Sequence, residues 1–207
     1  MASATWVLPS LDPEWRRACL ASMADPIHVR TLVVDNSRTN RGVAASWNLG
    51  AGTMRAQGHE WLVIVSEAIR FGLAGGLDLE AALDDDPGYP WVDALFGWHL
   101  IAFRASTIEA VGRFDEVFWP AYMEDTDYLY RMGLAGIASP RENDRPRRQL
   151  THIDAVDAGT EHGLRTGRVR VDFGEQARRY RQKWGGDQGH ETYRTPYGDP
   201  TLTWRDT

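Results

Sequence analysis

Three short apolar segments, separated by helical patterns, restrict the first third of the chain to one fold class. The segments are residues 5–8, 29–34 and 61–65. Helices are expected between them, because Pro13 suits the first turn of one and residues 43–57 carry the pattern of another. Continuously apolar strands that alternate with helices are typical of a parallel sheet covered on both faces. The sequence therefore predicts an α/β protein with a mostly parallel central sheet flanked by helices.

Polar residues follow each of these strands, and this is where an open sheet of this kind binds its ligands. Pro9 and Ser10 follow the first strand, residues 35–41 the second and residues 66–70 the third. The sequence contains no Gly-rich dinucleotide fingerprint, no Walker loop and no Gly-x-Ser-x-Gly elbow. It therefore predicts a ligand site at the strand ends that is not a nicotinamide or flavin site.

Length and composition exclude several other classes of protein. A chain of 207 residues is long enough for one domain with its own core. The net charge of −6 argues against a nucleic-acid-binding surface, and the single Cys19 excludes an internal disulfide or a cysteine-based zinc site. No apolar run approaches the ~20 residues that span a bilayer. We expect a soluble, cytoplasmic protein.

Residues 96–131 are the most informative stretch for function. A buried strand is expected at residues 99–103, followed by a helix over residues 105–111 that ends at Gly112. Next come Gly-x-Phe-Asp, an aromatic run and the three acids Glu124, Asp125 and Asp127 at a helix start. This order of parts resembles the C-terminal half of the catalytic domain in glycosyltransferase family 2, the GT-A-type nucleotide-sugar transferases, in a small bacterial or bacteriophage-like form.

The resemblance implies a catalytic site at the three acids. In this family the Asp of the Glu-Asp pair is the general base of inverting enzymes, so Asp125 takes that role here, with Glu124 beside it. The base accepts the proton of the acceptor hydroxyl as that oxygen attacks the anomeric carbon, and such proton transfer contributes typically ~10²–10⁴-fold in rate. Glu124 and Asp127 are expected to hold the acceptor or to shape the site. The alternative is that the acids only favour a helix N-terminus.

A second stretch resembles the nucleotide-recognition segment of the same family. It reads Asp-Asn-Ser at residues 35–37, then Asn-Arg-Gly at residues 40–42, then Asn48-x-Gly50. The resemblance implies that Asp35 accepts a hydrogen bond from a uridine- or thymidine-type base. The physical case is independent of it, because a carboxylate at a strand end suits an imide N–H.

Neighbouring residues complete the expected nucleotide site. By the same resemblance, Pro9 and Ser10 lie along the base, and Asn36 belongs to the segment that reads it. Arg38 and Arg41 are near enough in the sequence to reach a pyrophosphate, which suits bidentate guanidinium contacts. The alternative is an Asx-turn, in which the Asp-Asn pair only caps backbone groups.

The end of the third strand departs from the metal-binding Asp-x-Asp motif of the family. It carries Glu67, with Ala68 where the main Asp is expected. Glu67 and His152, which resembles a late histidine of the family, are candidate ligands for a divalent ion such as Mn²⁺ or Mg²⁺. Alternatively, Arg70 and a second arginine neutralise the departing diphosphate without a metal. The third possibility is that the chain has lost transferase activity.

Three further residues are placed by the resemblance. Gly97 lies in the position of a small-residue loop beside the donor sugar, where a glycine permits close approach of the backbone. Trp98 follows it and is a candidate for shaping the acceptor site. Lys183, in the C-terminal helix expected over residues 171–184, is a candidate for folding over the diphosphate, with Arg165 as the alternative.

These expectations combine into one functional prediction. Residues 1–207 form a GT-A-like domain, with a nucleotide-binding half at 1–95, an acceptor and catalytic half at 96–153, and a C-terminal helix and tail at 154–207. It is predicted to be an inverting, hexosyltransferase-like enzyme that moves a sugar from a nucleoside-diphosphate sugar to a hydroxyl acceptor on a protein, modified nucleobase, glycan or lipid. A phage-encoded chain would work in the host cytoplasm. The alternatives are a non-catalytic nucleotide- or carbohydrate-binding module and a nucleotidyltransferase.

Overall fold

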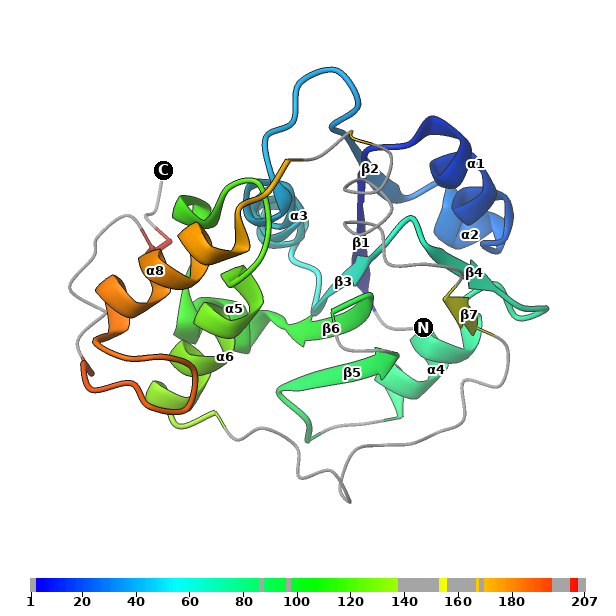
Figure 1. Ribbon diagram of the computed structural model, residues 1–207. Coiled ribbons are helices and arrows are strands. Elements are labelled where there is room, and N and C mark those ends of the chain that lie inside the picture. Colours follow the sequence, from blue (N-terminus) through cyan, green and yellow to red (C-terminus); the bar gives the residue numbers. More distant parts are fainter. Residues whose placement is uncertain are drawn as a thin grey trace.

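A five-stranded sheet in the order β2-β1-β3-β6-β5 forms the centre of the molecule (Figure 1). The computed structural model describes residues 3–85, 88–95, 98–137, 153–155, 167, 170–194 and 202–204. The strands of the sheet are β1 (Ala4–Ser10), β2 (Thr31–Asp35), β3 (Trp61–Val65), β5 (Trp91–Leu95) and β6 (Leu100–Arg104). β1 pairs in parallel with β2 and β3, whereas β6 runs antiparallel to β3 and β5. Two short strands, β4 (Ile69–Phe71) and β7 (Ile153–Ala155), form a separate antiparallel pair.

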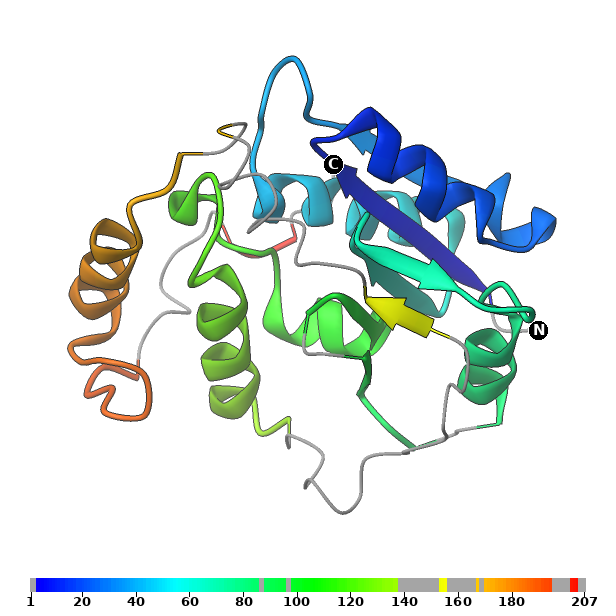
Figure 2. The same ribbon diagram turned by 45° about the vertical axis from the view of Figure 1, so that its right-hand side comes forward.

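Helices cover both faces of the sheet, as Figures 1 and 2 show. The helices are α1 (Pro13–Ala21), α2 (Asp25–His28), α3 (Val43–Gln57), α4 (Leu77–Asp84), α5 (Ala105–Val111), α6 (Glu124–Leu134) and α8 (Phe173–Trp184), with a 3₁₀ turn η1 (Glu116–Phe118). Alternate side chains of β1 face opposite ways: Trp6 and Leu8 pack with Cys19 of α1, and Val7 packs with Ala51 of α3. Two apolar cores therefore lie on the two faces, as the apolar strands predict. No helix in the described part of the chain is long and apolar enough to cross a membrane.

The last helix forms a further layer outside the sheet and its covering helices. Tyr180 and Trp184 of α8 pack with Phe118 of η1, and the Trp184 ring lies 4.6 Å from that of Tyr130 on α6. Both ribbon views place the start of α8 and the start of α6 toward the end of the molecule where β1 and β2 finish (Figures 1 and 2). The fold thus brings the predicted catalytic and nucleotide segments to one end.

The α/β class is confirmed, and several predicted elements match at both ends. α3, β3 and α5 begin and end where the sequence predicts. The parallel pairing is confined to β2-β1-β3, because β6 and β5 run antiparallel. The second strand begins at Thr31 instead of position 29, because a short helix with Pro26 in its first turn precedes it and leaves Val29 83% exposed. β4 and β5 were not predicted.

Candidate active site

The residues predicted to bind the nucleotide base meet at the carboxyl ends of β1 and β2. The register of the two parallel strands pairs Ser10 with Asp35 and Pro9 with Val34. The backbone N–H of Asn36 donates to the carbonyl oxygen of Ser10 at 2.7 Å. The sequence placed these residues on one sheet edge, and the structure brings them side by side.

Asp35 is a half-exposed carboxylate that already has two partners. Oδ1 accepts from the backbone N–H of Ser37 at 2.9 Å, and Oδ2 forms an ion pair with Arg16 of α1 at 2.8 Å. The hydrogen bonds of Ser37 and Arg16 hold the pKa of Asp35 well below its ordinary value. The alternative of an Asx-turn is therefore correct for Oδ1, which accepts from a backbone N–H two residues along the chain. A carboxylate has about four lone-pair sites, so both oxygens keep the capacity to accept from a ligand.

Glu67 is buried beside this edge and holds the loop between β1 and α1. Its two oxygens accept from the backbone N–H groups of Leu11 and Asp12 at 3.1–3.2 Å. Burial raises the pKa of Glu67 above its ordinary value, and hydrogen bonds from Ser10, Asp12 and Leu11 oppose that rise. In the described structure Glu67 therefore anchors backbone at the nucleotide edge.

The arginines near this edge differ in their surroundings. Nη1 of Arg70 donates to the carbonyl oxygens of Glu67 and Ile69 at 2.6 and 2.7 Å, and the guanidinium lies 5.6 Å from the Trp15 ring centroid. Arg38 and Arg41 are exposed. The exposed pair thus remains accessible to a phosphate group, whereas Arg70 is held by backbone and an aromatic ring.

The loop after β2 is fixed to the segment that precedes the three acids. The indole Nε1 of Trp119 donates to the carbonyl oxygen of Asn40 at 3.0 Å, and the backbone N–H of Val43 donates to the carbonyl oxygen of Pro120 at 3.0 Å. Between them Gly42 has a φ of +90°, and a Cβ there would lie 2.8 Å from Cδ1 of Trp119. Only glycine suits both the backbone conformation and the close approach. These contacts join the nucleotide segment to the catalytic segment.

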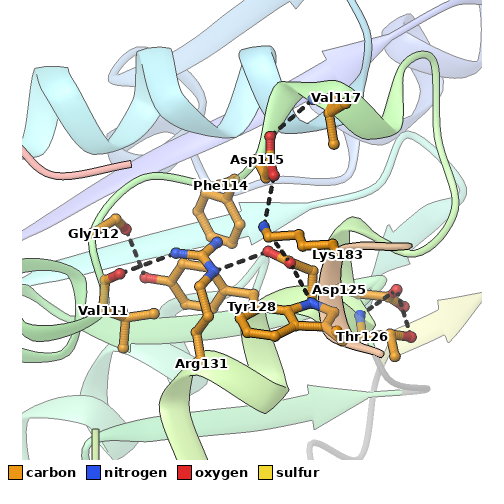
Figure 3. A network of polar contacts seen from close by, with 12 residues as sticks. Val111, Gly112, Phe114, Asp115, Val117, Asp125, Thr126, Tyr128, Arg131 and Lys183 are labelled. Carbon is orange, nitrogen blue, oxygen red and sulfur yellow. Dashed lines mark hydrogen bonds and ion pairs between the residues drawn. The ribbon is translucent and has the colours of Figure 1, made fainter. Parts of the chain in front are cut away.

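The start of α6 carries the predicted base on a strained backbone. Tyr122 and Met123 have φ values of 74° and 73°, which are unusual for residues with side chains. Strain of this kind costs about 1–3 kcal/mol per residue and clusters at functional sites. The Asp125 carboxylate that follows is partly exposed, and its Oδ1 accepts from the backbone N–H and the hydroxyl of Thr126 at 2.6 and 3.3 Å. Figure 3 shows these two side chains apart from the network around Lys183.

Glu124 lies next to Asp125 but is buried, with 6% of its surface exposed. Its Oε2 atom has no hydrogen-bond partner among the described residues. Burial, with the nearby charges of Asp125 and Asp127, raises the pKa of Glu124 to about 8. The Glu-Asp pair therefore contains one carboxyl group that is protonated at neutral pH, and two adjacent carboxyls with separate environments are suited to separate roles.

Asp127 is fully buried at the centre of a polar network between α6 and α8. Oδ1 accepts from Nε1 of Trp184 at 2.9 Å and pairs with Nζ of Lys183 at 2.6 Å, while Oδ2 accepts from Nε of Arg131 at 2.9 Å. Lys183 also pairs with Asp115 at 2.6 Å. Asp127 was predicted either to hold the acceptor or to shape the site. Because the side chain is buried and protein groups bind both of its oxygens, these contacts favour the second role. The ammonium group of Lys183 lies between two carboxylates and does not face a diphosphate site, whereas the alternative candidate Arg165 lies outside the described residues.

The Gly-x-Phe-Asp motif connects three helices, α3, α6 and α8, through ring packing, hydrogen bonds and an ion pair. Phe114 stacks on Tyr128 of α6 with ring centroids 4.0 Å apart, and its backbone is bound by Asn48 of α3. Asp115 Oδ1 accepts from the backbone N–H of Val117 at 3.0 Å, and Oδ2 pairs with the lysine described above. The sequence pattern marked this motif but did not reveal that Asn48 and Lys183 hold it. The sequence singles out both residues for other roles, because their partners in this motif are 66–68 positions away.

One of the remaining predicted site residues packs in the core, and the other two lie outside the described residues. The Trp98 ring stacks on Trp47 at 5.3 Å and lies 5.3 Å from Phe103, so it forms part of the core around α3 and β6. Gly97 and His152 lie outside the described residues. Of the two candidate metal ligands, only Glu67 can therefore be placed, and backbone N–H groups already bind both of its oxygens. Among the described residues no group of three His, Cys, Asp or Glu side chains is arranged to hold a metal ion.

Comparisons with known proteins identify the architecture. No protein-family model and no curated protein sequence matches this chain. The structure resembles the catalytic domain of Drosophila β1,4-galactosyltransferase 7 in complex with xylobiose, with a TM-score of 0.57 at 14% identity, covering 94% of this chain and 83% of that one. The chain has a GT-A-type fold. The fold predicted from the resemblance is thus confirmed.

Two further structures are similar with TM-scores below 0.5. A mutant of the same Drosophila enzyme, in complex with manganese, UDP-Gal and xylobiose, has a TM-score of 0.49 at 12% identity over 100% of this chain and 82% of that one. The mannosyltransferase PcManGT from Pyrobaculum calidifontis, in complex with GDP-Man and Mn²⁺, has a TM-score of 0.48 at 15% identity over 72% of this chain. This chain spans 58% of the length of PcManGT. At these identities the likeness concerns the GT-A fold, and the chemistry has to be argued from the site.

Proposed function

We propose that this protein is an inverting glycosyltransferase that moves a sugar from a nucleoside-diphosphate sugar to a hydroxyl acceptor. The observation that carries the proposal is the joint between the two predicted segments, in which Trp119 and Pro120 bind the backbone of Asn40 and Val43. The partly exposed Asp125 lies five positions after Pro120, so the joint supports a defined position of the proposed base relative to the proposed nucleotide edge. An in-line transfer needs such a fixed relation between base and donor.

Each group has a distinct role in the proposed reaction. Asp35 binds the imide of a uridine- or thymidine-type base, which lies along Pro9 and Ser10 next to Asn36. Arg38 and Arg41 are exposed beside that edge and compensate the charge of the diphosphate. Asp125 accepts the proton of the acceptor hydroxyl while the oxygen attacks the anomeric carbon and the nucleoside diphosphate leaves.

The neighbouring Glu124 supports this reaction through its protonation state. A protonated Glu124 adds no second negative charge beside the base, and it can donate a hydrogen bond to a sugar hydroxyl. Glu67 and His152 remain the proposed ligands of a divalent ion, which would neutralise diphosphate charge when bound. The described residues do not complete a metal site, so no step of the proposal depends on one.

A panel of nucleotide sugars, incubated with the protein with and without Mn²⁺, tests the proposal. We expect release of a nucleoside diphosphate from at least one uridine- or thymidine-type donor, and no release by the Asp125→Asn variant. Release of pyrophosphate would instead indicate a nucleotidyltransferase. A guanosine-type donor used in preference would contradict the role of Asp35.

A non-catalytic binding module is the second candidate, because two features disfavour turnover. Ala68 is fully buried where the family carries an acid, and Glu67 is bound to backbone. Thermal-shift measurements with the same nucleotides separate the two candidates. Stabilisation by nucleotide sugars, with every donor left intact over long incubation, would favour the binding module.

A further inference from the structure

A hollow of about 560 Å³ lies between the Trp119-Pro120 segment and the start of α8. Its volume is within the range of about 300–1,000 Å³ that is typical of small-molecule sites. Trp119 and Pro120 form one wall, and Asp172, Glu175 and Gln176 of the helix start form another. The hollow is separate from the nucleotide edge but shares the Trp119-Pro120 segment with the joint described above.

An aromatic platform is available in this hollow. Trp119 is 51% exposed, which is unusual for so large an apolar side chain. Its indole is nevertheless fixed, because Nε1 donates to the carbonyl oxygen of Asn40 and the ring lies against Gly42. A rigid, exposed indole offers contact area to a flat apolar ligand face at little cost in conformational entropy.

The polar groups of the hollow balance one another in charge. Arg179 donates to Glu175 at 2.6 Å and to the carbonyl oxygen of Val117 at 2.5 Å. The lining contains two arginines, Arg170 and Arg179, and two acids, Asp172 and Glu175. A charged ligand would gain little net attraction there. A neutral ligand with many hydroxyl groups could use the same donors and acceptors.

Gln176 provides an independent sign of a missing polar partner. Its side chain is 97% buried, since only 3% is exposed, and Nε2 donates to the carbonyl oxygen of Trp119 at 2.6 Å. Its Oε1 atom has no hydrogen-bond partner among the described residues. A buried carbonyl without a partner is costly, and Gln176 is among the residues that line the hollow.

We infer that this hollow is a subsite for a neutral glycan, with one sugar ring stacked on Trp119 and its hydroxyl groups bound by the polar residues of α8. This inference rests on the proposed function and deepens it, because it names the acceptor class as a glycan. Trp119 lies five positions before Glu124, so a glycan of a few units can extend from the subsite toward the Glu-Asp pair. The hollow therefore holds the acceptor at a distance from the reacting hydroxyl.

Donor-free binding of disaccharides tests the inference. Saturation-transfer NMR with the full chain would use cellobiose, maltose, lactose and an acidic chondroitin disaccharide as probes. We expect at least one neutral disaccharide to bind, and Trp119→Ala to weaken that binding at least about tenfold while Trp119→Phe retains most of it. Tyr193→Ala removes another exposed aromatic ring, outside the hollow, and should leave binding unchanged.

A second variant covers the case in which Trp119→Ala fails to fold. Arg170 is exposed on the rim of the hollow, and Arg170→Ala should weaken binding of the same disaccharide at least about threefold. Absence of neutral disaccharide binding, equal binding by Trp119→Ala, or stronger binding of the acidic disaccharide would each overturn the inference. Donor turnover is measured separately, so turnover without glycan binding would overturn this inference alone. Glycan binding without turnover would overturn the proposed enzymatic function and the acceptor role, and would leave only a glycan-binding site.

Discussion

Asn48 and Phe114 exchange two hydrogen bonds across the two halves of the protein. Nδ2 of Asn48 donates to the carbonyl oxygen of Phe114 at 2.9 Å, and Oδ1 accepts from its backbone N–H at 2.9 Å. Nδ2 also donates to Glu116. Asn48 comes from the helix that follows the nucleotide loop, and Phe114 from the motif that precedes the acids. The side chain therefore acts as a clamp between the two segments of the proposed site.

Replacement of this clamp should destabilise the protein strongly. Asn48→Leu keeps a similar volume but leaves the buried N–H and C=O of Phe114 without partners, which costs about 1–3 kcal/mol for each group. We expect a loss of roughly 2–5 kcal/mol in urea unfolding. Leu49→Ala, at a half-exposed neighbour on the same helix, should cost under about 1 kcal/mol. Similar unfolding midpoints for the two variants would show that the clamp contributes little.

The ion pairs of Lys183 give a second prediction about stability. Lys183→Met removes the positive charge between Asp115 and Asp127 and leaves Asp127 buried with one cationic partner fewer. Breaking a buried pair in this way costs about 3–5 kcal/mol. The double variant with Asp115→Asn should recover part of that loss, since it also removes the carboxylate that Lys183 neutralises, whereas Asp127 keeps its ion pair with Arg131.

An exposed pair on the same helix serves as the control. Arg181 pairs with Asp187 at 3.0 Å, and both side chains are about half exposed or more. Arg181→Met should therefore cost at most about 1 kcal/mol. A loss as small as this for Lys183→Met would refute the role of the network in joining α8 to α6.

The fold was predictable from sequence wherever one local signal decided the structure. The apolar run of β3, the helical pattern of α3 and the glycine after α5 each sufficed, and these elements match at both ends. β5 was not predicted, because its place in the sheet and its contact with the core depend on antiparallel pairing with β6. The shift of β2 came from tertiary packing, since Ile27 of the preceding helix is fully buried.

The site was predictable as a set of positions but not as a set of roles. Pattern and resemblance placed Asp35, Glu67 and Asp125 at segment ends, where chemistry is expected. They could not indicate that Glu67 is occupied by backbone N–H groups or that Asp127 is enclosed by α8, because burial and long-range partners decide both. The three acids of this group look alike in sequence, whereas the fold leaves Asp125 partly exposed and buries Glu124 and Asp127.

The partly exposed member of the acid group should be essential for transfer. Asp125→Asn keeps the shape and the hydrogen bonds to Thr126 but cannot accept the acceptor proton. We expect kcat to fall at least about 10²-fold, while calorimetry gives a nucleotide Kd within about twofold of the original. Asp187→Asn, at an exposed carboxylate beyond α8, should leave both values unchanged. Turnover by Asp125→Asn close to that of the original protein would eliminate the proposed base.

The buried Glu124 makes a prediction about pH. Its folded-state pKa is raised to about 8 from an ordinary value near 4.5, so between these pH values the folded protein binds more protons than the unfolded chain. Stability should therefore decrease as pH rises through this window and become level above it. Glu124→Gln carries no titrating group, so near pH 5 the variant and the original should be about equally stable. Near pH 8 the variant should be the more stable, by up to about 4 kcal/mol.

Urea unfolding at several pH values measures this difference, and the comparison cancels every group that the two proteins share. Glu109→Gln is a suitable control for the loss of a carboxylate, because its side chain is half exposed at the surface and far from a buried site. A stability gap that stays constant from pH 5 to 8 would mean that Glu124 is ionised throughout. The pair would then carry two negative charges, and the separate roles assigned to Glu124 and Asp125 would lose their physical basis.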